Sequence, residues 1–156
     1  MRVGQLELLR QLYVEAVVPQ TVWEELVEAR PDAPGAVAVR SSTWLRVVPD
    51  VLAPDDAAEA LAEVDAGEAA AIAVALVQHA DLLLVDDAAG RRAAVELGVA
   101  VRGTLGVLLT AKAAGMLTAV APAISALLAE GFRASGAVLD QALRAAGEAP
   151  ASAGGA

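Results

Sequence analysis

The sequence predicts an α/β fold, a three-layer α/β/α sandwich with a parallel sheet, because segments with helical periodicity alternate with short apolar runs. Residues 82–85 (Leu-Leu-Leu-Val) are too uniformly apolar for a half-exposed strand, and such a run is typical of a strand covered on both faces. The composition is 57% hydrophobic but only 3% aromatic, so the core must consist of Ala, Val and Leu. A chain of 156 residues is long enough for one domain.

The first fifty residues are expected to form two helices and two strands. Leucines recur at helical spacing near the start, and prolines interrupt the pattern further on. The expected elements are a helix over 5–13, a strand over 16–18 that stops at Pro19, a helix from Thr21, a loop over 30–35 and a strand over 44–48.

The rest of the chain is expected to alternate in the same way, with glycines ending the helices. We expect a short helix through Leu61 capped by Asp55 or Asp56, and a single domain over 1–147 followed by a disordered tail, 148–156. The other expected elements are a helix from Asp65, strands over 82–85 and 99–101, and helices over 91–97, 104–114, from Pro122 to Gly131 and from Ser135 to Ala146.

Composition and charge exclude several classes of protein. The net charge of −9 argues against broad, non-specific nucleic-acid binding, although metal ions in an acidic cleft can supply positive charge for a nuclease. The sequence has no Cys, which excludes disulfides and thiolate sites and fits a cytoplasmic protein. The apolar stretch 69–85 is broken by Gln78, His79 and Asp81, so we expect no membrane span.

Three acids are placed where a parallel sheet usually carries its functional groups. Asp86 and Asp87 follow the strand 82–85, and Glu68 lies in the first turn of the preceding helix. Functional groups gather just beyond the carboxyl ends of parallel strands. Clusters of oxygen ligands bind Mg²⁺ or Mn²⁺, and such ions activate water for phosphodiester cleavage. The pattern therefore predicts a metal site formed by these three carboxylates.

Each acid also has a purely structural interpretation. Asp65 and Glu68 have the spacing of a capping box, in which each side chain binds a backbone N–H of the helix start. Asp87 can cap the helix that follows it. Capping and metal binding do not exclude each other.

The remaining polar positions give weaker signals. His79, the only histidine, is near a helix end, where a surface or capping role is expected. Residues 103–106 only weakly resemble a phosphate-cradling turn, and Thr104 can be explained as a helix cap. Arg91 and Arg92 follow the acid pair by one helical turn, either as solvated surface or to pair with an acid or a phosphate.

Taken in order, these pieces resemble the PIN-like domain family, in a branch catalogued mainly as a domain of unknown function. Its relatives include the VapC-type toxins of toxin–antitoxin pairs. The likeness extends from Leu6 to Glu148. The segments that carry it are 65–72 (DAGEAAAI), 80–87 (ADLLLVDD), Arg91-Arg92, 97–99 (LGV), 103–108 (GTLGVL) and 131–133 (GFR).

The resemblance implies a Mg²⁺- or Mn²⁺-dependent ribonuclease, with RNA as substrate and an antitoxin protein as a partner. By position, Glu68 matches the helix acid of the family and Asp87 matches the acid after the later strand. Asp86 is its neighbour and a possible substitute. Thr104 matches a small polar position near the site, and Arg91 matches a basic position to which the resemblance assigns no role.

The sequence departs from the family at its start. PIN domains open with an apolar strand that ends in a metal-binding Asp, whereas the first Asp here is Asp32, in a proline-rich segment. We therefore expect the first strand and its acid to be missing, either because the natural protein is longer or because this form is degenerate. Such a loss would expose apolar helix faces and unpaired backbone groups, which a partner or a homodimer would cover.

Three functions follow as hypotheses. The first is a PIN-like ribonuclease, with a toxin as its most specific form. The second is a PIN-like interaction module that has lost its metal site and acts through a protein partner. The third is an unrelated nucleotide-binding α/β protein, which is disfavoured because the sequence has neither G-x-G-x-x-G nor a P-loop lysine motif.

Overall fold

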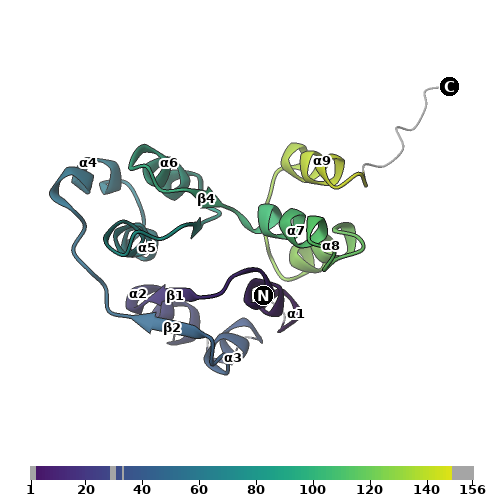
Figure 1. Ribbon diagram of the computed structural model, residues 1–156, viewed down its shortest axis with the longest axis horizontal. Helices are drawn as coiled ribbons and strands as arrows, with labels where there is room; N and C mark the ends of the chain where they lie inside the picture. The colour runs from purple at the N-terminus through teal and green to yellow at the C-terminus, as the bar shows by residue number, and fades with distance from the viewer. Residues whose placement is uncertain (1–2, 29–30, 33, 149–156) are drawn as a thin grey trace. The chain divides into compact units, whose positions relative to one another are not determined.

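The computed structural model describes residues 3–28, 31–32 and 34–148, which form two compact units (Figure 1). The first unit ends at Gly103 and the second begins at Thr104. The first unit contains α1 (Val3–Leu12), β1 (Ala16–Pro19), α2 (Gln20–Trp23), the π-helix η1 (Glu24–Glu28), α3 (Pro34–Arg40), β2 (Leu45–Val48), the 3₁₀ helix η2 (Asp55–Ala57), α4 (Ala58–Leu61), α5 (Ala66–Val77), β3 (Leu83–Leu84), α6 (Ala88–Glu96) and β4 (Val101–Arg102). The second contains α7 (Thr104–Ala113), α8 (Ala121–Ala129) and α9 (Gly136–Ala145).

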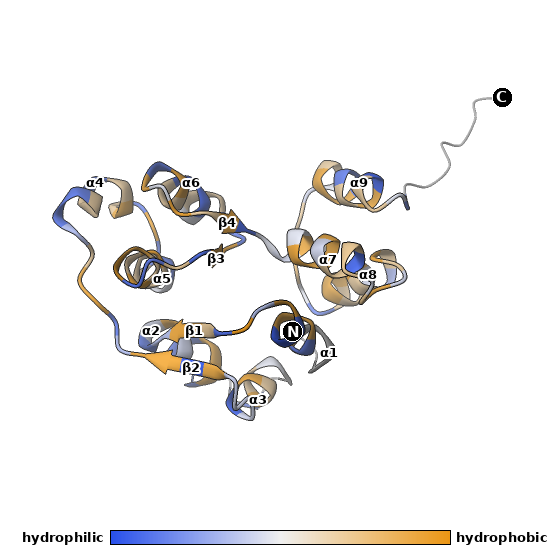
Figure 2. Ribbon diagram, viewed as in Figure 1, coloured by the Kyte–Doolittle hydropathy of each residue, from blue (hydrophilic) through white to orange (hydrophobic). Residues whose placement is uncertain are grey.

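The strands confirm the predicted α/β class with parallel pairing, but they form two separate pairs. β1 pairs with β2 and β3 pairs with β4, both in parallel. Helix α5 contacts both β1 and β3, so one helix packs on a strand from each pair. Figure 2 shows that β1 and β2 are largely hydrophobic. Within the described residues no strand precedes β1, and the first described element is α1.

The prediction of a strand buried on both faces over 82–85 was wrong. Leu83 and Val85 are each 9% exposed, whereas Leu84 between them is 40% exposed. Successive side chains of a strand point to opposite faces, and here only one of those faces is covered. The strand itself is also shorter than predicted, covering Leu83–Leu84.

An aliphatic core joins α5, β3 and α6 and fixes the region of the candidate site, as the composition predicted. Ile72 of α5 and Ala94 of α6 are completely buried in it. From α6 the core takes two alanines, and full burial of a side chain such as Ile72 contributes about 1.5–3 kcal/mol. The whole cluster comprises Ile72, Ala75, Leu83, Val85, Ala93, Ala94 and Val99.

The predicted helix ends are confirmed where glycine ends the helix. Gly98, Gly115 and Gly131 all have positive φ, the left-handed conformation that follows many helices. At the end of α5 the same conformation is adopted by His79, with φ 51°, and its side chain is exposed.

Two local predictions in the first unit were wrong. Neither Asp55 nor Asp56 caps its helix, because both lie inside the 3₁₀ turn η2, whose N-cap position is Pro54. Part of the expected loop 30–35 is helical, since α3 begins at Pro34, and proline fits the first turn of a helix. The helix expected from Thr21 is present: it begins one residue earlier, at Gln20, and continues as the π-helix η1.

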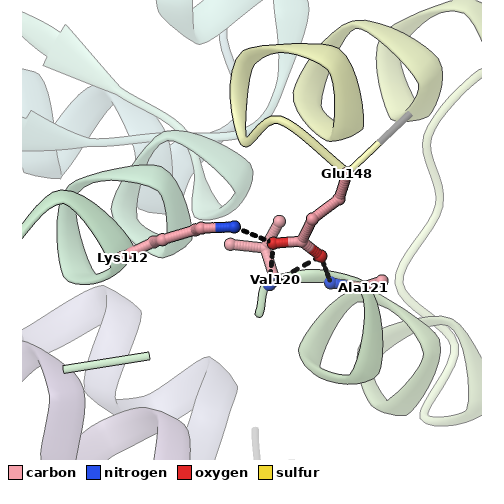
Figure 3. A network of polar contacts seen from close by, with 4 residues as sticks. All are labelled: Lys112, Val120, Ala121 and Glu148. Carbon is pink, nitrogen blue, oxygen red and sulfur yellow. Dashed lines mark hydrogen bonds and ion pairs between the residues drawn. The ribbon is translucent and has the colours of Figure 1, made fainter. Parts of the chain in front are cut away.

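In the second unit, the carboxylate of Glu148 links α7 to the start of α8. This side chain accepts hydrogen bonds from the backbone N–H groups of Val120 (2.8 Å) and Ala121 (2.9 Å), at the start of α8, and pairs with Lys112 of α7 (Figure 3). Glu148 was expected to begin a disordered tail, but these contacts hold it in place. Residues 149–156 of that tail lie outside the described residues, and the single-domain expectation stays a prediction.

None of the helices in the described part of the chain has the length and apolar character needed to cross a membrane.

Candidate functional site

The first turns of α5 and α6 approach each other at Glu68 and Gly90. Gly90 is buried, and a Cβ built on it would lie 3.2 Å from Oε2 of Glu68 and 3.1 Å from Cγ2 of Val85. Glycine therefore allows the Glu68 carboxylate to lie directly against α6. The structure thus brings Glu68 close to the start of the helix that Asp87 precedes.

Several negative charges surround Glu68. Its pKa is raised above the ordinary value, first by burial and then by the neighbouring carboxylates of Asp87, Asp65 and Glu25. Burial and like charges both disfavour the ionised form of an acid. Two of the three acids predicted to form the metal site, Glu68 and Asp87, are therefore close enough to repel each other.

Asp87 is the N-cap of α6, which confirms its structural interpretation. Its Oδ2 accepts hydrogen bonds from the backbone N–H groups of Ala89 (2.6 Å) and Gly90 (3.1 Å). These bonds, first that of Gly90 and then that of Ala89, lower the pKa of Asp87. Both bonds use Oδ2, so capping is compatible with a ligand at Oδ1.

The predicted capping box at the start of α5 was wrong. Asp65 occupies the N-cap position, but its side chain makes no capping hydrogen bond. The carboxylate of Glu25 lies against this turn, because a Cβ on Gly67 would be 2.5 Å from Oε2 of Glu25. An acid from a distant segment thus approaches the turn that the local motif was expected to satisfy.

Glu25 is the residue that sequence reasoning missed. It lies in the π-helix η1, where Val27 is buried and Glu25 is exposed. A π-helical turn shifts the side-chain faces relative to the α-helical period, so a 3.6-residue pattern misassigns them. The sequence signal that could have indicated Glu25 is the acidic pair Glu24-Glu25 within an otherwise apolar helical segment.

Asp86 and Arg91 lie together at the end of β4. A Cβ on Gly103 would lie 2.7 Å from Oδ1 of Asp86 and 3.0 Å from Nη1 of Arg91. Arg91 also donates from Nη1 to the carbonyl oxygen of Val85 at 3.2 Å. Arg91 is thus half-buried and bonded to a backbone carbonyl, and its pairing with an acid or a phosphate stays a prediction.

The family of the chain follows from a match to a known family model. The DUF3368 family model, described as a PIN domain, matches residues 1–148. The chain belongs to the PIN domain family. PIN domains are commonly nucleases and generally use divalent metals. No curated protein and no solved structure matches the chain.

The acids of this PIN domain fit a divalent metal in their chemistry but do not form a complete set of protein ligands. Carboxylate oxygens suit Mg²⁺ and Mn²⁺, and Mg²⁺ is often held by one or two carboxylates with water completing the shell. Across residues 3–28, 31–32 and 34–148, however, no three His, Cys, Asp or Glu side chains are grouped so that they could hold an ion.

The other predicted positions of the PIN domain are less informative. Thr104 is the first residue of α7, in the second unit, and its accessory role stays a prediction. His79 lies just beyond α5 on the surface, as expected from its place near a helix end.

Proposed function

We propose that this PIN domain is a metal-dependent ribonuclease that hydrolyses RNA phosphodiester bonds. Glu68 and Asp87 are the principal metal-binding carboxylates in this proposal, and Asp86 is the neighbouring acid. The observation that carries it is the crowding of negative charge around Glu68, whose pKa is raised by burial and by three other carboxylates.

The crowding has a physical consequence that favours cation binding. Glu68 is partly buried near like charges, which is unfavourable unless a positive charge offsets them. Mg²⁺ or Mn²⁺ would supply that charge and, when bound, would activate water and stabilise the developing charge on the phosphate. A bound cation would also reduce the repulsion between RNA and a chain whose net charge is −9.

The chain's own residues prepare the site for this chemistry. The backbone N–H groups of Ala89 and Gly90 keep Asp87 ionised and fix its orientation. Gly90 leaves room for the Glu68 carboxylate at the same helix start. Both acids belong to the first unit.

RNA cleavage in the presence of Mn²⁺ tests the proposal. Glu68→Gln and Asp87→Asn should each reduce cleavage by at least about 10–100-fold, since a lost carboxylate weakens metal binding. Glu96→Gln is the matched control, because Glu96 is an exposed acid at the far end of α6. Mn²⁺ should also raise the Tm of the wild type but not that of Glu68→Gln. Unchanged cleavage by both site variants would reject these roles.

The more specific form of the proposal is a toxin that acts on cytoplasmic RNA and is held inactive by an antitoxin protein. The support is the family's relation to VapC-type toxins. Expression of the chain in its host should arrest growth, and co-expression of a small neighbouring reading frame should restore it. Normal growth in the presence of active protein would reject the toxin role but not the ribonuclease activity.

A second candidate is a PIN-like interaction module without catalysis, acting through a protein partner or as a homodimer. It is favoured by the lack of a three-residue ligand group in the described part of the chain and by the two separate strand pairs. Calorimetric titration with Mn²⁺ distinguishes the two candidates, because tight binding counts against the module.

A further inference from the structure

The turn between β3 and α6, residues 85–87, is held by hydrogen bonds at both ends. The N–H of Val85 donates to the carbonyl oxygen of Arg102 at 3.0 Å, and the carbonyl oxygen of Val85 accepts from Nη1 of Arg91 at 3.2 Å. Asp87, at the other end, accepts from Ala89 and Gly90. Arg91 is therefore a side chain that reaches back from α6 to the residue immediately before the two acids.

The same side chain meets Asp86 at Gly103. A Cβ on Gly103 would lie 2.7 Å from Oδ1 of Asp86, 3.0 Å from Nη1 of Arg91 and 3.6 Å from the carbonyl oxygen of Val85. Three polar groups, two from the segment after β3 and one from α6, thus surround the glycine that follows β4. Any side chain at this position would displace the acid or the arginine, so the absence of a side chain is part of the arrangement.

We infer that Arg91 is the positioning residue of the candidate site: it holds the carbonyl of Val85 and thereby fixes the turn that presents Asp86 and Asp87. The inference rests on the proposed function, which gives those acids their role. Arginine suits the task because its planar group offers five donors in a fixed geometry and remains charged. Arg91 is half-buried, whereas its neighbour Arg92 is exposed.

Two backbone amides report directly on the turn. The N–H of Val85 donates to the carbonyl oxygen of Arg102, and the N–H of Gly90 donates to the carboxylate of Asp87. The N–H of Gln78 donates to the carbonyl oxygen of Val74 in α5, and this amide serves as the reference. In Arg91→Met, hydrogen exchange of the two turn amides should become about tenfold faster, since a hydrogen bond to a charged donor is lost. The reference amide should be unchanged, which excludes a general loss of stability.

Arg92→Met is the matched control, because it removes the same charge from the same helix. Arg92 lies within electrostatic range of Asp87, so this variant measures the effect of charge alone. Arg91→Lys should restore slow exchange in part, because lysine can still donate one hydrogen bond. Gly103→Ala retains Arg91 but places a Cβ against Asp86, and it should also accelerate exchange at Val85.

Cleavage of RNA with Mn²⁺ by the same variants completes the experiment. Arg91→Met should lower kcat at least tenfold more than Arg92→Met does, with little change in KM, because only Arg91→Met misplaces the acids although both variants lose the same charge. Exchange in Arg91→Met equal to that in Arg92→Met overturns the inference, as does an equal kcat. If the wild type cleaves no RNA, the proposed function fails, and the exchange data still judge whether Arg91 holds the turn.

Discussion

At the scale of single residues, Asp87 is the N-cap of α6, and the proposed function gives it a second role as a metal ligand. It accepts hydrogen bonds from the first turn of α6, and it also lies within electrostatic range of Glu68. An N-cap requires a side-chain oxygen acceptor but not a negative charge, whereas metal binding depends on the carboxylate. The two roles can therefore be separated by substitution.

Asp87→Asn should preserve the fold and strongly reduce cleavage, whereas Asp87→Ala should lower both the stability and the cleavage. Asn caps helices about as well as Asp, so the Tm of Asp87→Asn should stay within about 2 °C of the wild type. Loss of the cap in Asp87→Ala should lower the Tm by roughly 4 °C. Thermal melts and RNA cleavage measure the two effects. If Asp87→Asn cleaves RNA like the wild type, Asp87 only caps α6 and does not bind the metal.

At the scale of secondary-structure elements, glycine positions were the most reliable signal in the sequence. Gly98, Gly115 and Gly131 end helices because the left-handed conformation beyond a helix suits a residue without a Cβ. His79 shows the limit of this rule, since a helix also ends there without glycine. The side chain of His79 is exposed, so the free energy that a substitution changes there is mainly that of the backbone conformation.

His79→Gly should stabilise the protein by about 1 kcal/mol, because glycine adopts a positive φ without steric penalty. Urea unfolding measures the gain. Gln78→Gly is the matched control: Gln78 has φ −89°, so glycine there adds only disorder to the unfolded chain and should destabilise. Equal destabilisation by both variants would show that His79 makes a favourable contact that outweighs its backbone conformation.

Elements with mixed signals were harder to predict. Prolines were interpreted as markers of a loop over 30–35, yet α3 begins at Pro34. Residues 82–85 look uniformly buried in the sequence, but neighbouring side chains of a strand point in opposite directions and Leu84 is on the uncovered face. In both cases the residue type was compatible with two structures, and packing selected one.

At the scale of the whole molecule, both units bury apolar side chains, and the second also has a charged contact between its helices. The first has an aliphatic core between α5, β3 and α6. In the second, one carboxylate near the end of the described chain joins α7 to α8 (Figure 3). Lys112, its partner, is the only lysine in the sequence, so no second ammonium group can replace it.

This carboxylate should make the stability of the second unit depend on pH. Its contacts, above all the hydrogen bond with Lys112, lower the pKa of Glu148 from 4.5 to about 2. An acid with a lowered pKa stabilises the fold at pH values above 4.5, and that contribution is lost as the pH falls from 4.5 to about 2. Acid unfolding of the wild type should therefore show a loss of stability in this range.

In Glu148→Gln the loss between pH 4.5 and 2 should be smaller, and the Tm at pH 7 should be lower by a few degrees. Asp140→Asn, at an exposed position on α9, is the control for removing a negative charge from the same unit. The same acid dependence in Glu148→Gln and the wild type would contradict the assignment.

The sequence by itself determined the α/β class, the aliphatic core, most helix ends and two acids of the candidate site, Glu68 and Asp87. These features depend on residue type and on spacing within a single element. Only the tertiary structure showed that Glu25 approaches the start of α5 and that Arg91 holds Val85 next to Gly103. Such contacts depend on how separate elements pack, and the π-helical turn that carries Glu25 also shifts its side chains away from the period by which a sequence assigns them.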